Sequence, residues 1–164
     1  MPETDFEAAM RDVDIARYFV NAATVVLYTM AGLIVTPGKF FIKHDRKAIG
    51  YFTAAINVSG HRIGTIAVSF TRTGAATLAR GMLGDDVGDL EHDMLDAVGE
   101  VTNMIAGQAR AAMAEAGVVL RAGTPTVMAG DDIQIEYAAG APIVVIPFAM
   151  SDSAFTVKFC LSKT

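Results

Sequence analysis

Residues 86–117 read DVGDLEHDMLDAVGEVTNMIAGQARAAMAEAG, and the rest of the architecture is built around them. Their apolar side chains recur in steps of three and four residues, which is the period of an α-helix with one buried stripe. The stripe comprises Val87, Leu90, Met94, Val98, Val101, Ile105, Ala109 and Ala112. The spacing therefore predicts a long helix that packs one face against a core.

A polar stripe runs along the opposite face of the same predicted helix. It comprises Asp93, Asp96, Glu100, Asn103, Gly107 and Arg110. Glu100 and Asn103 are three residues apart, so a carboxylate and an amide project side by side from adjacent turns. Every surface helix has a polar face, so on the residues alone simple solvation is the first explanation.

Two glycines, Gly99 and Gly107, indicate more than solvation. A glycine weakens a helix by about 1 kcal/mol relative to alanine, so its presence inside one indicates close packing or the close approach of another molecule. We interpret both glycines as interruptions of the polar face that leave the pair of Glu100 and Asn103 sterically open.

The spacing of these residues resembles a known signature. Asp96, Glu100 and Asn103, followed by Gly107 and by Pro125, which 21 residues separate from Asn103, resemble the active-site signature of the CheC/CheX/FliY family of chemotaxis phosphatases. The spacer before Pro125 is one residue shorter than the usual one, which changes little in the geometry of the pair. Four further segments are similar to CheX-like, single-site members: residues 21–37, 81–84, 125–127 and 144–148.

The resemblance implies an α+β fold, namely a CheC-like pseudo-twofold domain with an antiparallel or mixed β-sheet, two long helices and one shorter helix. Periodicity and turn residues agree with these elements. We expect helices at residues 12–31, 74–83 and 86–117. We expect extended segments at residues 33–43, 50–58, 62–70, 118–122, 126–128, 133–137, 142–150 and 154–161.

A weak internal repeat supports two similar halves. When the first helix is aligned with the long helix so that Asn21 meets Asp96, Val25 and Tyr28 meet the positions of the acid and the amide. Neither Val25 nor Tyr28 can replace a carboxylate or an amide, so the first copy would be chemically silent. The resemblance implies the same for CheX-like members. A second alignment, at a slightly larger offset, matches Gly60, Ile63 and Ile66 with Gly140, Ile143 and Ile146.

Composition and charge narrow the classes of function. The 164 residues fit a single domain, 1–164, in which we expect residues 1–10 to be flexible. The net charge is −5 and no cluster of Lys and Arg exceeds residues 43–47, which argues against a nucleic-acid partner. Cys160 is the single cysteine, so no disulfide can form within the chain, and we expect a cytoplasmic location.

Residues 18–35 are the one apolar run long enough to suggest a membrane span. Asn21, Thr24 and Thr29 interrupt the run, and it lacks the flanking residues and cleavage site of a signal peptide. We therefore expect a buried helix here and no membrane insertion.

The resemblance also implies a substrate, the aspartyl phosphate of a CheY-like receiver domain. Hydrolysis of such a group depends on placing a water in line with the breaking bond and on stabilising charge. An amide can hold a water in one orientation, so Asn103 would position the attacking water. Glu100 would dock to the active-site lysine of the receiver, and Asp96 would tune or cap that face.

We expect no metal or cofactor site in this chain. His44, His61 and His92 lack the spacing of paired ligands, so we interpret them as surface residues. The resemblance places Mg²⁺ on the partner receiver, and it also implies a homodimer.

Three functions stay open at this point. The first is a protein aspartyl-phosphate phosphatase that acts on receiver domains in chemotaxis or two-component signalling. The second is a module of the same fold that binds a receiver or a flagellar partner without catalysis. The third is a dimerising scaffold whose polar helix face is merely solvated. A loss of turnover with retained affinity in Asn103→Ala would separate the first from the second.

Overall fold

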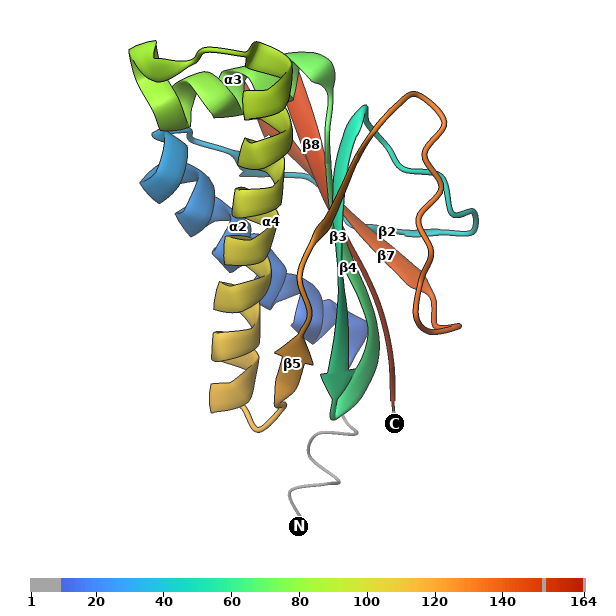
Figure 1. The fold of residues 1–164 in the computed structure, drawn as a ribbon. Coiled ribbons are helices and arrows are strands. Elements are labelled where there is room, and N and C mark those ends of the chain that lie inside the picture. The colour runs from blue at the N-terminus through green and yellow to red at the C-terminus, as the bar shows by residue number, and fades with distance from the viewer. Residues whose placement is uncertain (1–9, 152, 164) are drawn as a thin grey trace.

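The computed structural model describes residues 10–151 and 153–163. Three helices lie together on one face of a single sheet (Figure 1). They are α2 (Asp12–Ala31), α3 (Arg72–Leu83) and α4 (Leu90–Glu115), with the short 3₁₀ helix η1 (Gly84–Asp86) between the last two. The strands are β1 (Thr36–Pro37), β2 (Phe41–Lys43), β3 (Phe52–Gly60), β4 (Arg62–Phe70), β5 (Leu120–Ala122), β6 (Thr126–Ala129), β7 (Ile143–Met150) and β8 (Ser153–Lys163).

Every strand pair in the sheet is antiparallel. The order is β1-β7-β8-β4-β3-β5, with β2 also on β7 and β6 also on β3. Two hairpins, β3–β4 and β7–β8, therefore meet at the centre, where β4 pairs with β8 along the whole length of β4 and Val68 lies opposite Val157. The α+β fold expected from the sequence is confirmed.

The topology divides into two halves with the same element order. Each half begins with a long helix, continues with two short strands and ends with a hairpin: α2-β1-β2-β3-β4 and α4-β5-β6-β7-β8. The short strands of each half pair with the first hairpin strand of the other half, since β1 and β2 join β7 while β5 and β6 join β3. The domain is thus pseudo-twofold, and the halves are interlocked through the sheet.

The alignment of the first helix with the long helix agrees with this arrangement, because α2 and α4 occupy the same place in their halves. The alignment of the strands is wrong. It matches Ile63 and Ile66 of β4 with Ile143 and Ile146 of β7, whereas the element order equates β4 with β8. Alternating apolar strands resemble one another at any even shift, so such an alignment carries little register information.

The helix ends follow local chemistry. The carboxylate of Asp14 accepts a hydrogen bond from the backbone N–H of Arg11 at 3.1 Å, which satisfies a donor at the start of α2. The helix ends at Ala31 because Gly32 adopts a left-handed conformation with φ of 66°. At the start of α4 the side chain of Asp89 accepts a hydrogen bond from the backbone N–H of His92.

Within the described residues no helix is both long and apolar enough to cross a membrane.

One core lies between the helices and the sheet. The ring of Phe19 from α2 stacks on Phe159 of β8 with centroids 5.1 Å apart, and Phe155 stacks on both Phe70 and Phe148. Residues 1–9 of the segment expected to be flexible lie outside the described residues. Met10 packs against this core, and its carbonyl accepts a hydrogen bond from Arg62 at 2.7 Å.

The segments 44–50 and 130–142, which we call the back layer, lie on the side of the sheet away from the helices (Figure 1). The strand predicted at residues 133–137 is wrong: it forms one isolated bridge, between Lys47 and Gln134, flanked by two backbone hydrogen bonds. The segment then turns toward the sheet, and the backbone N–H of Ala138 donates to the hydroxyl of Thr65 at 2.9 Å.

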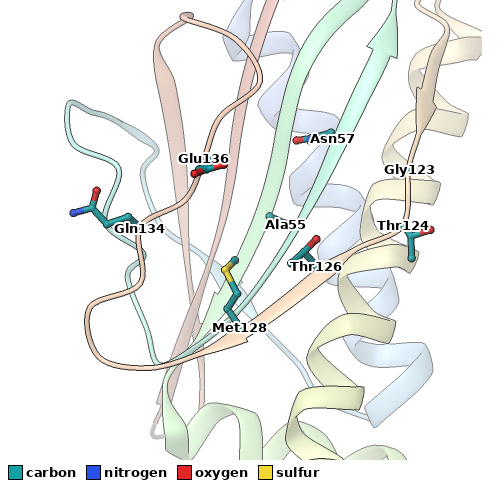
Figure 2. A pocket seen from close by; sticks show the side chains of 8 residues that line it. All are labelled: Ala55, Asn57, Gly123, Thr124, Thr126, Met128, Gln134 and Glu136. Atoms are coloured by element: carbon teal, nitrogen blue, oxygen red, sulfur yellow. The ribbon is translucent and has the colours of Figure 1, made fainter.

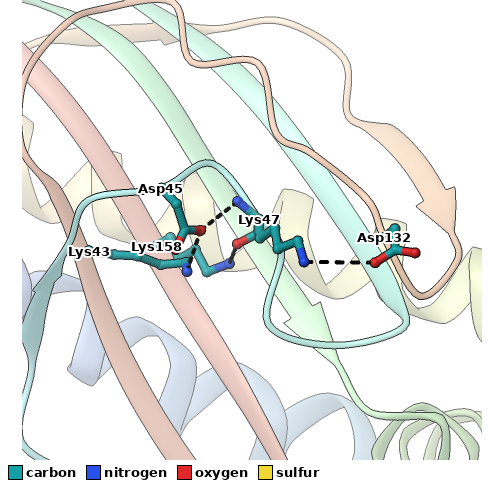
Figure 3. Close-up of polar contacts among 5 residues, drawn as sticks. All are labelled: Lys43, Asp45, Lys47, Asp132 and Lys158. Atoms are coloured by element: carbon teal, nitrogen blue, oxygen red, sulfur yellow. Dashed lines mark hydrogen bonds and ion pairs between the residues drawn. The ribbon is translucent and has the colours of Figure 1, made fainter.

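A lysine lies fully buried beneath the back layer. Lys158 of β8 is 0% exposed, and its ammonium donates to the carbonyl of Lys47 at 3.3 Å (Figure 3). Beside it, Lys43 pairs with Asp45 at 2.6 Å, and Lys47 reaches Asp132 at 3.9 Å. Burial lowers the pKa of Lys158 to about 8, because a charged ammonium loses its hydration there.

Cys160 of β8 is buried beneath the same back layer. Its thiol donates to the carbonyl of Ala141 at 3.0 Å, and burial raises the pKa of the thiol. A buried thiol with a raised pKa is a packing group and not a reactive nucleophile, as expected from the sequence.

Candidate functional site

The predicted pair lies on the solvent face of α4. Glu100 and Asn103 are both exposed, and helical pitch sets their Cβ atoms about 5–6 Å apart. Within residues 10–151 and 153–163, neither side chain has a hydrogen bond or an ion pair with its own chain. Both functional groups are therefore available to another molecule.

The opposite face of α4 anchors the pair rigidly. Ala97, Val98, Val101, Ile105 and Ala106 are all at most 4% exposed and pack into the core. The buried hydroxyl of Thr102 is satisfied by the carbonyl of Val98 at 2.7 Å. A helix fixed in this way holds exposed side chains in a reproducible geometry, which a site for positioning a water requires.

The two glycines of α4 have different roles. Gly99 is buried, and a Cβ added there would lie 2.9 Å from a methyl of Val127 on β6. Its interpretation as an opening of the polar face is therefore wrong; it permits close packing of α4 on the sheet. Gly107 lies on the face of the pair, where an added Cβ would meet only the guanidinium of Arg110, 4.0 Å away.

Asp96 lies one turn before Glu100 and is also exposed. Its carboxylate lies 3.2 Å from Nε2 of His92, a contact between two largely exposed side chains on successive turns. The capping role at the start of the helix belongs to Asp89, so Asp96 does not cap. The spacing of four residues between His92 and Asp96 could have revealed this contact in the sequence, but His92 was interpreted only as a surface residue.

Pro125 directly precedes β6, whose Val127 packs on α4 at Gly99. The structure thus places Pro125 in a segment that flanks α4, and not on the exposed face that carries the pair. The counterparts on the first helix, Val25 and Tyr28, are 48% and 64% exposed on α2. That face of α2 is accessible, but at these two positions it presents no carboxylate or amide.

A hollow of about 220 Å³ adjoins Glu100. It forms where the end of α2, the end of α3 and the early turns of α4 meet, toward the top of Figure 1. Its lining residues are Met30, Met82, Leu83, Asp93, Asp96, Ala97 and Glu100. We call it the methionine hollow. Because its lining comes from three helices, no spacing in the sequence could have revealed it.

A second cavity, of about 430 Å³, lies on the far face of the sheet (Figure 2). Its walls are β3 and β6 on one side and the back layer on the other, with Asn57, Thr126, Met128 and Glu136 among the lining side chains. None of the site residues predicted from the sequence lines this cavity. It is therefore separate from the site on α4.

Among the described residues, no three His, Cys, Asp or Glu side chains gather closely enough to hold a metal ion. The arrangement on α4 offers an exposed amide, an exposed carboxylate and an apolar recess beside them. Such a site can bind and orient groups that a partner brings to it.

Comparison with known proteins gives a consistent result. The family model described as "Chemotaxis phosphatase CheX" matches residues 52–149. The chain is 45% identical to a chemotaxis protein CheX from Desulfovibrio desulfuricans, with a TM-score of 0.85 over 91% of this chain and 99% of that one. It is 29% identical to CheX from Vibrio vulnificus, with a TM-score of 0.82 over 91% and 99% of the two chains.

A more distant structure is the CheX-CheY-BeF3-Mg²⁺ complex from Borrelia burgdorferi, at 20% identity and a TM-score of 0.77, covering 92% of this chain and 99% of that one. At this identity the likeness shows the fold. No curated protein matches the chain significantly.

Proposed function

The chain belongs to the CheX family of chemotaxis phosphatases, and from that premise we propose that it hydrolyses the aspartyl phosphate of a CheY-like receiver domain. The family name supports phosphatase activity, and the complex from Borrelia burgdorferi pairs a CheX with a CheY. The observation that carries the proposal for this chain is the state of Glu100 and Asn103, which are exposed, adjacent and free of partners within the part of the chain that the structure describes.

In the proposed reaction a water oxygen attacks the phosphorus, the bond from phosphorus to the aspartyl oxygen breaks, and the products are inorganic phosphate and the free aspartate. Asn103 accepts a hydrogen bond from that water and offers its own N–H, which fixes the direction of attack. A single group that positions or stabilises the reacting atoms is worth on the order of 10² to 10³ in rate.

Glu100 is assigned to docking. A carboxylate beside a phosphoryl group is repelled unless a cation lies between them, and the active-site lysine of the receiver supplies that cation. Asp96, one turn away and in contact with His92, tunes the charge of the same face. The Mg²⁺ of the reaction belongs to the receiver, and this chain contributes no cofactor of its own.

We further propose that the protein works in the cytoplasm as a homodimer. The edge strand β2 supports self-association, because its Phe41 and Ile42 are 45% and 43% exposed although both are large and apolar. An alternative function, a receiver-binding module without catalysis, fits the same exposed pair.

Phosphate release from receiver domains loaded with acetyl phosphate tests the proposal. We expect the protein to accelerate release, Asn103→Ala to abolish the acceleration with binding retained, and Glu100→Ala to weaken binding. Unchanged release in the presence of the wild-type protein, together with measurable binding, would favour the non-catalytic module.

A further inference from the structure

The acidic residues of this protein are concentrated around the site. Between residues 81 and 109 there are seven carboxylates and no Lys or Arg: Asp85, Asp86, Asp89, Glu91, Asp93, Asp96 and Glu100. All 13 Lys and Arg lie elsewhere with the other 11 carboxylates, which gives the rest of the chain a net charge of +2. In a protein with a net charge of −5, residues 81–109 thus form a strongly negative stretch, bounded by Arg80 and Arg110.

The methionine hollow is lined in part by this negative stretch. Its apolar wall comes from Met30, Met82 and Leu83, and Leu83 is 39% exposed. Its other wall carries the carboxylates of Asp93, Asp96 and Glu100. An apolar recess bordered by acids matches a side chain with an aliphatic stem and a cationic head.

The hollow is fixed by close contact between helices. A Cβ added at Gly81 would lie 2.5 Å from the carbonyl oxygen of Ala31, so the ends of α3 and α2 touch through backbone. Met30 and Met82, which both line the hollow, are the sequence neighbours of the two residues in this contact. Methionine is flexible and polarizable, and it adapts to the side chain that it contacts.

On the basis of the proposed function, we propose that the methionine hollow docks a second basic side chain of the receiver, an arginine or lysine on the surface flanking the receiver's active site. The stem would pack on Met30, Met82 and Leu83, and the cationic head would meet Asp93 and Asp96. This contact is additional to the active-site lysine assigned to Glu100. It makes a basic rim on the receiver the feature that this protein recognises.

The charges exclude other occupants. An anionic group would be repelled by the three carboxylates of the wall. A purely apolar side chain would cover the carboxylate of Glu100, which has no partner among the described residues, and burying an unpaired charge costs several kcal/mol. The surrounding carboxylates would also steer a basic partner toward the hollow, which raises the association rate at low salt.

Two variants test the two parts of the proposal. Leu83→Ala removes part of the apolar wall, and its control is Ile63→Ala on β4, a side chain of nearly equal exposure at 41%. The triple variant Asp85→Asn, Asp86→Asn, Glu91→Gln removes three charges that have no partner among the described residues. Its control is Asp131→Asn, Asp132→Asn, Glu136→Gln, which changes the net charge equally on the back layer.

Binding is measured by calorimetry with a CheY-like receiver held in its activated form by beryllofluoride and Mg²⁺, so no turnover is needed. We expect Leu83→Ala to weaken binding about fivefold and the acidic triple variant about tenfold at low salt, with a flatter dependence on salt. The two controls should bind within about twofold of the wild-type protein. Replacing the flanking Arg and Lys of the receiver singly by Glu should identify one whose effect is not additive with Leu83→Ala.

Equal effects of each variant and its control would overturn the docking proposal, as would the absence of binding by the wild-type protein. Failure of the catalytic proposal is distinguishable from both. In that case phosphate release would be absent while binding still depended on Leu83 and on the acidic residues.

Discussion

The carbonyl oxygen of Ala31 occupies the space that a side chain on Gly81 would need, because a Cβ there would lie only 2.5 Å away. The contact joins α3 to α2 and sets one wall of the methionine hollow. A helical glycine is normally a weakness, so its presence in α3 follows from this contact and not from helix propensity.

Gly81→Ala should therefore destabilise the protein. Alanine favours the helix by about 1 kcal/mol, but overpacking against a backbone carbonyl costs about 1–3 kcal/mol and cannot be relieved by a side-chain rotation. We expect a net loss in the free energy of unfolding, measured by urea denaturation followed by circular dichroism. A neutral or stabilising effect would mean that the ends of α2 and α3 are not in contact.

Gly107→Ala is the matched opposite case. An alanine there meets only a guanidinium nitrogen of Arg110 at 4.0 Å, so the substitution should stabilise the protein by about 1 kcal/mol. The added methyl lies on the face of Glu100 and Asn103, and we expect it to raise the KM for the phosphorylated receiver. A stabilised variant with an unchanged KM would show that the partner does not approach α4 this closely.

Asn103→Ala should lower kcat by on the order of 10² to 10³ with little change in affinity, because the amide acts on the water and not on the receiver. Stopped-flow measurement of receiver dephosphorylation provides the rate. The control is Gln108→Ala, an exposed amide of α4 outside the polar stripe, which should retain full activity. Equal losses in the two variants would remove the specific role of Asn103.

Glu100→Gln preserves the shape of the side chain and removes its charge. Because the proposed role is pairing with a lysine, we expect a rise of about tenfold in KM, corresponding to about 1.4 kcal/mol, and a small change in kcat. Raising the salt concentration should weaken the wild-type protein more than the variant. A fall confined to kcat would instead indicate a part in the chemical step.

Lys158→Met should reveal the cost of the buried ammonium. The pKa of Lys158 is lowered to about 8 by burial and, to a smaller extent, by nearby Lys43, with Asp45 opposing. In the unfolded chain a lysine has a pKa of about 10.4, so the cost at neutral pH is up to about 3 kcal/mol, less about 1 kcal/mol for the hydrogen bond to Lys47. We expect the variant to be more stable than the wild-type protein by about 2 kcal/mol at pH 7.

The pH dependence of this difference has a definite sign. Below about pH 8 Lys158 is protonated in both the folded and the unfolded wild-type protein, and the gain in stability from Lys158→Met is complete. Between about pH 8 and 10.4 the unfolded chain holds more protons than the folded one, so the wild-type protein gains stability with rising pH and the advantage shrinks. Burial also raises the pKa of Cys160 on β8 and of Tyr137 in the back layer, and subtracting the stability curve of the wild-type protein from that of the variant cancels their contributions. Lys39→Met, which removes the same charge from an exposed position, is the control.

The periodicity of the sequence was sufficient to predict the helix that carries the site. The long helix and the exposure of Glu100 and Asn103 follow from spacing of three and four residues, and Gly32 ends α2 where a left-handed residue was needed. Apolar and polar residues alternate over 133–137 as in a strand, but the segment forms only one isolated bridge, between Gln134 and Lys47, among the described residues. Gly99 could not be assigned from sequence, since its neighbour Val127 lies on another element. The methionine hollow likewise depends on tertiary packing.

The exchange of short strands between the halves affects how the chain folds as it is made. While the ribosome has released only the first half, β1 and β2 have no β7 to pair with, and β4 lacks its neighbour β8. The sheet can close only after residues near the C-terminus have emerged, because β4 and β8 join Arg62 to Lys163 and Phe70 to Phe155. Contacts this distant along the chain slow folding, so the nascent first half stays incomplete until β8 has emerged.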